Sequence, residues 1–209
     1  MATGLDELLR YAAEHPIDPA CDHFYFLRHG QTAGNAQRIF QALTEPLNET
    51  GHGQARRAAQ LLADVPLATI VCSDAQRVLD TAGAVAALHG IAPQREPGLR
   101  ERNFGCLIGT SSAQIDWACD PEGGESLREF AERKRAALEH ALAQPGPVLV
   151  VAHGGSLFAL VAMLGLAIDL NVLGNAQPLR FERRGPTWTV TPLLTQADDQ
   201  AADDQAAIA

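Results

Sequence analysis

The chain has 209 residues, a hydrophobic fraction of 46%, a charged fraction of 20% and a formal net charge of −9 at pH 7. These values are typical of a soluble globular protein of one domain, and they argue against the basic surface of a nucleic-acid-binding protein. The four cysteines show no C-x-x-C spacing, the N-terminus has no signal-peptide pattern, and the apolar run at 157–168 is too short to span a membrane. We therefore expect a reduced, cytoplasmic protein without a nucleic-acid or membrane partner.

Apolar periodicity and helix-ending residues predict five helices and five strands. The helices are expected at 5–15, 51–63, 74–88, 127–144 and 154–164. The strands are expected at 23–28, 68–72 and 148–152, with a hairpin at 178–194. Capping boxes are predicted at Ser73 with Gln76 and at Ser126 with Glu129, while the segment 106–124 is predicted to be irregular.

Strands that alternate with helices predict an α/β fold, a three-layer sandwich with a mostly parallel central sheet. The fully apolar strand VLVVA at 148–152 agrees, because parallel strands are covered by helices on both faces. We expect one domain at 21–195, an N-terminal extension at 1–20 and a disordered acidic tail at 196–209.

Polar and glycine residues follow three of the predicted strands directly. Arg28-His29-Gly30 follows the first, Ser73-Asp74 and then Arg77 follow the second, and His153-Gly154-Gly155 follows the third. Ligands of parallel sheets bind beyond the carboxyl ends of the strands, so two histidines and two arginines are expected at the binding edge.

This set of side chains suits a phosphoryl group. Arginine binds phosphate oxygens bidentately, glycine-rich helix starts add backbone N–H donors, and a neutral imidazole is a competent nucleophile. Nearby arginines favour the neutral imidazole, and a leaving alkoxide needs an acid. The candidate acid is Glu101, although it stands between Arg100 and Arg102, and such a charged run is more often a solvated face.

Six motifs, in this order along the chain, carry a resemblance to a known family. They are RHGQTAGN (28–35), EPLNETGHGQA (45–55), SDAQRVLDTA (73–82), LRERNFG (99–105), EGGES (122–126) and VVAHGG (150–155). The chain from Phe24 to Leu194 resembles the histidine phosphatase superfamily, the phosphoglycerate-mutase-like enzymes.

The resemblance implies roles for individual residues. It implies that His29 is phosphorylated, that Arg28, Arg77 and His153 hold the phosphoryl group, and that Glu101 donates the proton. It further implies that Asn35 lines the phosphate pocket. Three more residues are expected close to that pocket, namely Gln31, Thr32 and Gly154.

Two departures from the family pattern concern the substrate rim. Gln31 stands where relatives often have glutamate, and Cys106-Leu107-Ile108-Gly109 stands where many have a tryptophan and a glutamate. The apolar start of that segment predicts an apolar rim.

The predicted function is a metal-independent phosphatase that uses no cofactor and hydrolyses a small phosphorylated metabolite through a phosphohistidine. A cofactor-dependent phosphoglycerate mutase and an inactive phosphate-binding protein stay as alternatives, and the oligomeric state, a homodimer included, stays open. No Cys, His or Asp cluster has metal-ligand spacing. The remaining histidines are interpreted as incidental: His15, His23, His52, His89 and His140.

Overall fold

A computed structural model describes residues 4–167 and 174–193. Its helices are α1 (Leu5–Glu14), α2 (Ala33–Gln37), α3 (Glu49–Leu62), α4 (Gln76–His89), α5 (Leu127–Leu142) and α6 (Gly154–Met163), with 3-10 turns at Pro97–Leu99 and Gly105–Leu107. Its strands are β1 (His23–Arg28), β2 (Thr69–Cys72), β3 (Gln94–Arg95), β4 (Val148–Ala152), β5 (Pro178–Arg184) and β6 (Thr187–Pro192). The predicted tail at 196–209 lies outside the described residues.

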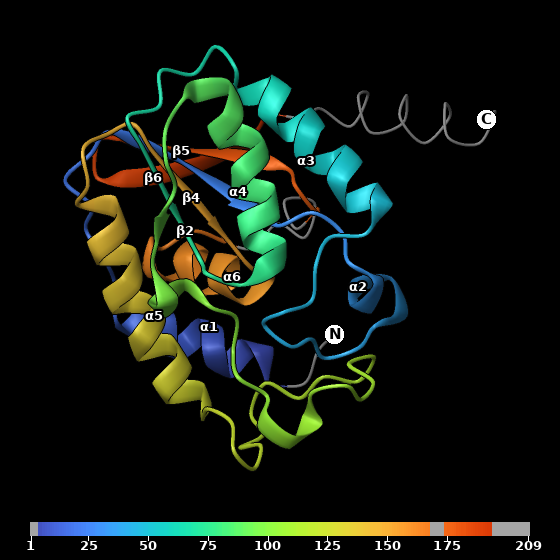
Figure 1. The fold of residues 1–209 in the computed structure, drawn as a ribbon. Coiled ribbons are helices and arrows are strands. Elements are labelled where there is room, and N and C mark those ends of the chain that lie inside the picture. The colour runs from blue at the N-terminus through green and yellow to red at the C-terminus, as the bar shows by residue number, and fades with distance from the viewer. Residues whose placement is uncertain (1–3, 168–173, 194–209) are drawn as a thin grey trace.

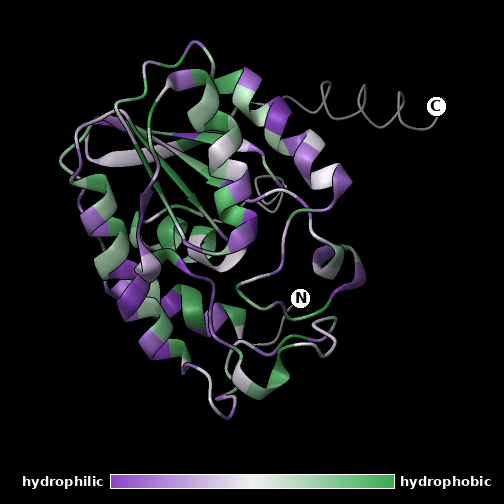
Figure 2. Ribbon diagram, in the orientation of Figure 1, coloured by the Kyte–Doolittle hydropathy of each residue, from purple (hydrophilic) through white to green (hydrophobic). Residues whose placement is uncertain are grey.

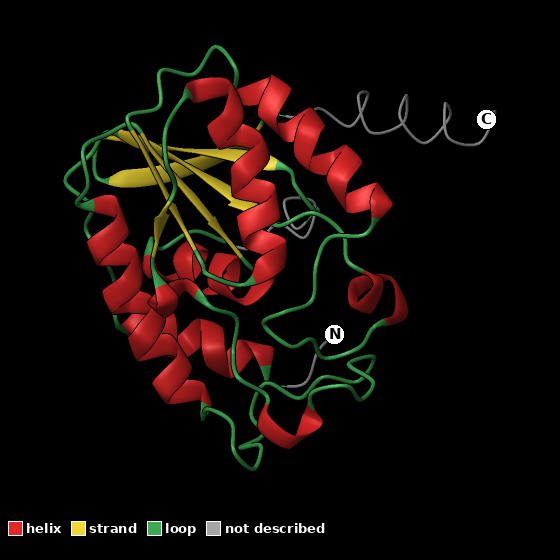
Figure 3. Ribbon diagram, viewed as in Figure 1, coloured by secondary structure: helices red, strands yellow, loops and turns green. Residues whose placement is uncertain are grey.

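The strands form one six-stranded sheet in the order β3-β2-β4-β1-β5-β6. The pairs β3–β2, β2–β4 and β4–β1 are parallel, whereas β5 and β6 are antiparallel and form the predicted hairpin. The predicted α/β sandwich with a mostly parallel sheet is therefore confirmed (Figures 1 and 3).

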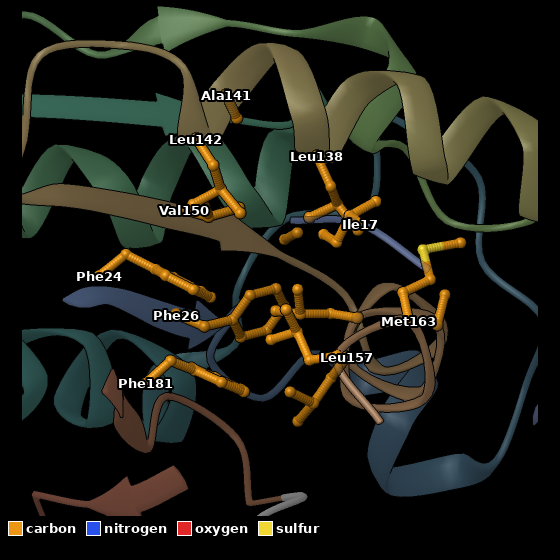
Figure 4. Packing of buried hydrophobic residues seen from close by; sticks show 14 of the residues in the cluster. Ile17, Phe24, Phe26, Leu138, Ala141, Leu142, Val150, Leu157, Met163 and Phe181 are labelled. Atoms are coloured by element: carbon orange, nitrogen blue, oxygen red, sulfur yellow. The ribbon is translucent and has the colours of Figure 1, made fainter. Parts of the chain in front are cut away.

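The central strands bury side chains on both faces, which is why they are apolar throughout. Phe24 and Phe26 of β1 belong to the core beneath α1, α5 and α6, whereas Tyr25 and Leu27 belong to the core beneath α3 and α4. The same alternation in β4 places Val150 with the first group, as Figure 4 shows. The central strands are accordingly mostly green in Figure 2, whereas the helices also carry purple residues.

Helix α1 contributes to the core on the side of α5 and α6, although residues 1–20 are predicted to be an extension. Leu8 and Ala12 are fully buried, and the helix packs against α5 and α6. The domain boundaries themselves stay a prediction.

Side-chain caps account for the starts of α2, α3 and α5. The capping box of Ser126 and Glu129 is present at the start of α5. The capping box predicted for Ser73 and Gln76 is wrong, because α4 begins at Gln76 with Ala75 as a cap without a side-chain bond. The hydroxyl of Ser73 instead accepts from Ala75 N and contacts a histidine ring described below.

Helix α2 and strand β3 are absent from the sequence prediction. Helix α2 has five residues and depends on a capping box between Thr32 and Asn35, while β3 has two residues at the edge of the sheet. Elements this short carry too little periodicity to be recognised. Among the described residues, no helix is long and apolar enough to cross a membrane.

Candidate active site

The carboxyl ends of β1, β4 and β2 lie beside one another because the three strands are parallel neighbours in register. The residues that directly follow them are His29, His153 and Ser73. The rings of His29 and His153 meet edge to face, with 5.3 Å between their centroids. The structure thus brings together groups that are more than 120 residues apart in the chain.

The ring of His29 is held in one tautomer. Its Nδ1 lies 2.8 Å from the carbonyl oxygen of Gly30, and a carbonyl can only accept, so Nδ1 carries the proton. This leaves the lone pair of Nε2 available for attack on an electrophile. The side chain is 4% exposed, and burial, followed by the charges of Arg77 and Arg28, holds the pKa of His29 well below its usual value. The neutral, nucleophilic imidazole is therefore the form present at neutral pH.

Arg77, in the first turn of α4, is oriented by two partners. Its Nη1 donates to the carbonyl oxygen of Ala42 at 2.9 Å, and its Nη2 lies 3.4 Å from Nδ1 of His153. Because a guanidinium only donates, Nδ1 of His153 accepts, and the proton on Nε2 faces the hydroxyl of Ser73 at 3.0 Å. Burial and the charge of Arg77 hold the pKa of His153 well below its usual value.

The two arginines give this end of the site a positive charge. Arg28 ends β1, and its Nε lies 3.6 Å from where a Cβ on Gly154 would be. Burial lowers the pKa values of Arg28 and Arg77, while the carboxylate of Glu101 opposes this for both. An arginine remains charged in a protein, so this arrangement of two cations beside two neutral imidazoles is able to bind an anion.

Glu101 lies against the start of α6. Its Oε2 accepts from Gly155 N at 2.9 Å, and its Oε1 accepts from Arg102 N at 3.0 Å. A Cβ at residue 155 would lie 2.3 Å from Oε1 of Glu101 and 2.7 Å from the ring of Trp117. The absence of a side chain at residue 155 therefore leaves the space that the Glu101 carboxylate occupies.

The loop that carries Glu101 is held in place by hydrogen bonds from two side chains of α5. Arg133 donates to the carbonyl oxygens of Gly98 and Arg100 at 2.7 and 3.0 Å, and the buried Lys134 contacts the same two carbonyls. Glu101 thus belongs to a fixed loop and not to a solvated charged face.

A close backbone approach fixes the loop after His29. A Cβ at residue 51 would lie 2.0 Å from the carbonyl oxygen of Gln31, and a Cβ at residue 30 would lie 2.5 Å from that of Gly51. Both positions therefore require glycine, which explains Gly51 in the EPLNETGHGQA motif.

The four predicted pocket residues divide into two pairs. Asn35 and Gly154 line the cavity, whereas Gln31 and Thr32 are not among its lining residues. Thr32 caps α2 and donates to Gln41 Oε1 at 2.8 Å, and Gln31 accepts from Asn48 Nδ2 at 2.9 Å. Gln31 and Thr32 therefore shape the loop, and no contact with the cavity is found for them.

A cavity of about 380 Å³ opens over these groups. At one end it is lined by Arg28, His29, Arg77, Glu101 and His153. Its remaining wall is mostly apolar and comprises Leu5, Ile39, Phe40, Phe104, Ile115, Trp117 and Phe158. The five other histidines do not line it.

The apolar wall differs from the rim expected at 106–108. Cys106 and Ile108 are exposed, and none of the three residues lines this cavity. Ile108 instead lines a neighbouring cavity of about 470 Å³. That neighbouring cavity is also lined by Arg77 and Glu101, so Ile108 meets the expectation in part, whereas the apolar wall of the first cavity comes from other segments.

Two polar residues near the site are missing from the sequence prediction, namely Thr81 and Asn175. Thr81 Oγ1 accepts from Gly30 N at 3.1 Å, and Asn175 Nδ2 donates to His29 O at 3.0 Å. Ser73, which was expected at this edge, faces His153. Thr81 lies within the SDAQRVLDTA motif, one helical turn after Arg77, which was the available signal. Across residues 4–167 and 174–193, no group of three or more His, Cys, Asp or Glu side chains could hold a metal ion.

Proteins similar to this chain include one named as a reductase, one named as a phosphatase and one named as a probable mutase. An agropine synthesis reductase of Rhizobium rhizogenes is 31% identical over 193 residues, which cover 87% of this chain but only 44% of that protein. A glucosyl-3-phosphoglycerate phosphatase of Mycolicibacterium vanbaalenii is 35% identical, covering 72% of this chain and 79% of that protein. A probable phosphoglycerate mutase of Photorhabdus laumondii is 37% identical, with coverages of 68% and 74%.

A solved structure of a mycobacterial glucosyl-3-phosphoglycerate phosphatase with VO3 superimposes with a TM-score of 0.67. It is 29% identical and covers 81% of this chain and 97% of its own. The family profile of the histidine phosphatase superfamily (branch 1) matches residues 24–191, which include every motif quoted above. The chain therefore belongs to the histidine phosphatase superfamily and is an enzyme of that type.

Proposed function

We propose that the protein hydrolyses a small phosphomonoester through a phosphohistidine on His29. The observation that carries the proposal is the tautomer of this ring: Nδ1 donates to the carbonyl oxygen of Gly30, so the Nε2 lone pair is available, and the ring lies in the field of Arg77 and Arg28. A neutral imidazole in an anion site is the arrangement that nucleophilic attack on phosphorus needs.

The first half-reaction forms the phosphoenzyme. Arg28, Arg77 and the N–H of Gly154, which lines the cavity at the start of α6, hold the phosphoryl oxygens and neutralise the charge of the transition state. Nε2 of His29 attacks phosphorus as the ester P–O bond breaks, and the carboxyl group of Glu101 gives its proton to the leaving alkoxide. His153 keeps the Arg77 guanidinium aimed at the phosphoryl group.

The second half-reaction restores the enzyme. The Glu101 carboxylate takes a proton from water, the water oxygen attacks phosphorus, and the N–P bond breaks to release inorganic phosphate. Both steps need only protons and the groups already named, as in other phosphoryl transfers that depend on positioning and charge.

The choice of water over a second alcohol rests on the cations around the cavity. A mutase must hold a bisphosphorylated intermediate, which needs a second anion site. The lining arginines beyond the anion site are Arg38, exposed at the rim, and Arg102. Arg102 directs its donors to the carbonyl oxygens of Trp117, Cys119 and Glu125 and so has little capacity left for a ligand.

The phosphoenzyme is tested by rapid quench with a labelled phosphomonoester. We expect acid-labile, alkali-stable phosphate that maps to His29 and is lost in His29→Ala. Label on serine, cysteine or aspartate would overturn the mechanism. No label and no turnover, together with tight phosphate binding, would favour the inactive binding protein.

Phosphatase and mutase are separated by supplying 3-phosphoglycerate with catalytic 2,3-bisphosphoglycerate. The proposal predicts little 2-phosphoglycerate. Efficient isomerisation with little release of free phosphate would establish the mutase alternative instead.

A further inference from the structure

The apolar wall of the cavity is continuous and is built from segments that are distant in the sequence. Leu5 comes from α1, Ile39 and Phe40 from the chain after α2, Ile115 and Trp117 from the loop at 108–124, and Phe158 from α6. Their rings touch in series: Phe40 lies 4.4 Å from Phe104, Phe104 lies 5.8 Å from Trp117, and Trp117 lies 6.2 Å from Phe158, between ring centroids.

The apolar wall starts next to Glu101, the proposed proton donor. The ring of Trp117 and the carboxylate of Glu101 both lie against Gly155, within 3 Å of where its Cβ would be. A proton donor must lie at the ester oxygen of the leaving group. The carbon atoms attached to that oxygen therefore enter the cavity beside Trp117, and the wall faces the alcohol part of the substrate.

The polar side chains on this side of the cavity are Asn35, Arg38, Gln41, Arg102 and Ser112, and three of them bond partly within the protein. Asn35 Oδ1 accepts from Thr32 N, and Gln41 Oε1 accepts from Thr32 Oγ1. The guanidinium of Arg102 donates to backbone carbonyls. Phe104 and Phe158 offer no hydrogen-bond partners, so the hydroxyl groups of a sugar or glycerate placed against them would lose hydrogen bonds to water, which costs binding free energy. An apolar group in the same place gains binding free energy by leaving water.

We propose that this wall is a leaving-group subsite, and that the preferred substrates are monophosphates of alcohols bearing an apolar chain or ring next to the ester carbon. This inference rests on the proposed phosphatase activity and specifies its substrate class. It separates the protein from the relatives whose printed names refer to phosphoglycerate compounds.

The test is a series of monophosphates of primary alcohols, namely ethyl, butyl, hexyl and 2-phenylethyl phosphate, with glycerol 1-phosphate as the polar member. Their leaving groups are similar alkoxides, so differences in kcat/KM report the subsite. We expect kcat/KM to rise about threefold to fourfold per methylene until the wall is covered, since each buried CH₂ contributes about 0.8 kcal/mol. The 2-phenylethyl ester should exceed glycerol 1-phosphate by about tenfold or more.

Two substitutions locate the effect. Phe158→Ala should reduce the ratio of kcat/KM for 2-phenylethyl to ethyl phosphate by about tenfold, and Ile115→Ala should reduce it about fourfold, which provides a second reading should the first variant fold poorly. Leu88→Ala is the matched control, because Leu88 is 57% exposed on α4 and does not line the cavity. Its ratio should equal that of the unaltered protein.

The outcomes are distinguishable. Phosphate release that is flat across the series, or highest with glycerol 1-phosphate, would overturn this inference and leave the phosphatase proposal standing. No release from any ester would overturn the proposed function and the inference with it. If Phe158→Ala and Ile115→Ala both left the ratio of kcat/KM for 2-phenylethyl to ethyl phosphate unchanged, the assignment of this wall as the leaving-group subsite would also be wrong.

Discussion

Acidification should destabilise the fold through His29 and His153. Their side chains are 4% and 0% exposed, and burial, followed by the charge of Arg77, holds both pKa values well below the usual value. In the unfolded chain both rings titrate near pH ~6.5. Below that pH the unfolded state binds protons that the folded state does not bind, so the free energy of unfolding falls as the pH falls.

The size of the effect follows from this proton difference. Each ring removes about 1.4 kcal/mol per pH unit between the unfolded pKa and the lower folded pKa. Lowering the pH from about 7.5 to about 5.5 should therefore remove up to about 2.7 kcal/mol through the two rings together. Carboxylates with lowered pKa values, such as Asp74 and Glu125, lose their contribution only below about pH 4.5, outside this interval.

The measurement is urea-induced unfolding, followed by tryptophan fluorescence in a buffer free of phosphate, at both pH values. His29→Asn and His153→Asn should each lose about half of the pH-dependent decrease. Leu88→Ala, which replaces no ionisable group, should keep all of it. The reasoning would be refuted if both histidine variants showed the same pH-dependent decrease in the free energy of unfolding as the unaltered protein. It would also be refuted if acidification stabilised the fold.

Three further predictions concern the site. Glu101→Gln should reduce kcat/KM for alkyl phosphates by about 100-fold or more but affect an activated aryl phosphate much less, since that leaving group needs little protonation; equal losses would count against Glu101 as the acid. Thr81→Val should lower the free energy of unfolding by about 1–3 kcal/mol in urea titrations, because it leaves the buried N–H of Gly30 without its acceptor, and a change under about 0.5 kcal/mol would contradict that role. Activity should persist in EDTA because Arg28 and Arg77 supply the charge, and loss of turnover that a divalent ion restores would show that a metal takes part.

Much of the reaction centre could be predicted from the sequence because its residues follow the strands that carry them. A parallel sheet aligns the carboxyl ends of its strands, so an apolar run ending in Arg28-His29-Gly30 and another ending in His153-Gly154-Gly155 must meet at one edge. The capping box of Ser126 and Glu129 was also predicted correctly, because a capping box involves residues only three positions apart. The capping box predicted at Ser73 was wrong, because the Ser73 hydroxyl contacts His153, a residue distant in the sequence.

The substrate wall was decided by the tertiary structure. Leu5, Phe40, Trp117 and Phe158 belong to four segments without a shared motif, and they become one surface only when α1, α6 and the long loops pack around the cavity. The sequence indicated an apolar rim at 106–108 because those residues are adjacent to a landmark, yet the backbone turns Cys106 and Ile108 toward solvent. The reactive residues at strand ends can be read from the local sequence because they directly follow the strands. The shape of a pocket depends on side-chain directions, which are set by packing between segments distant in the sequence.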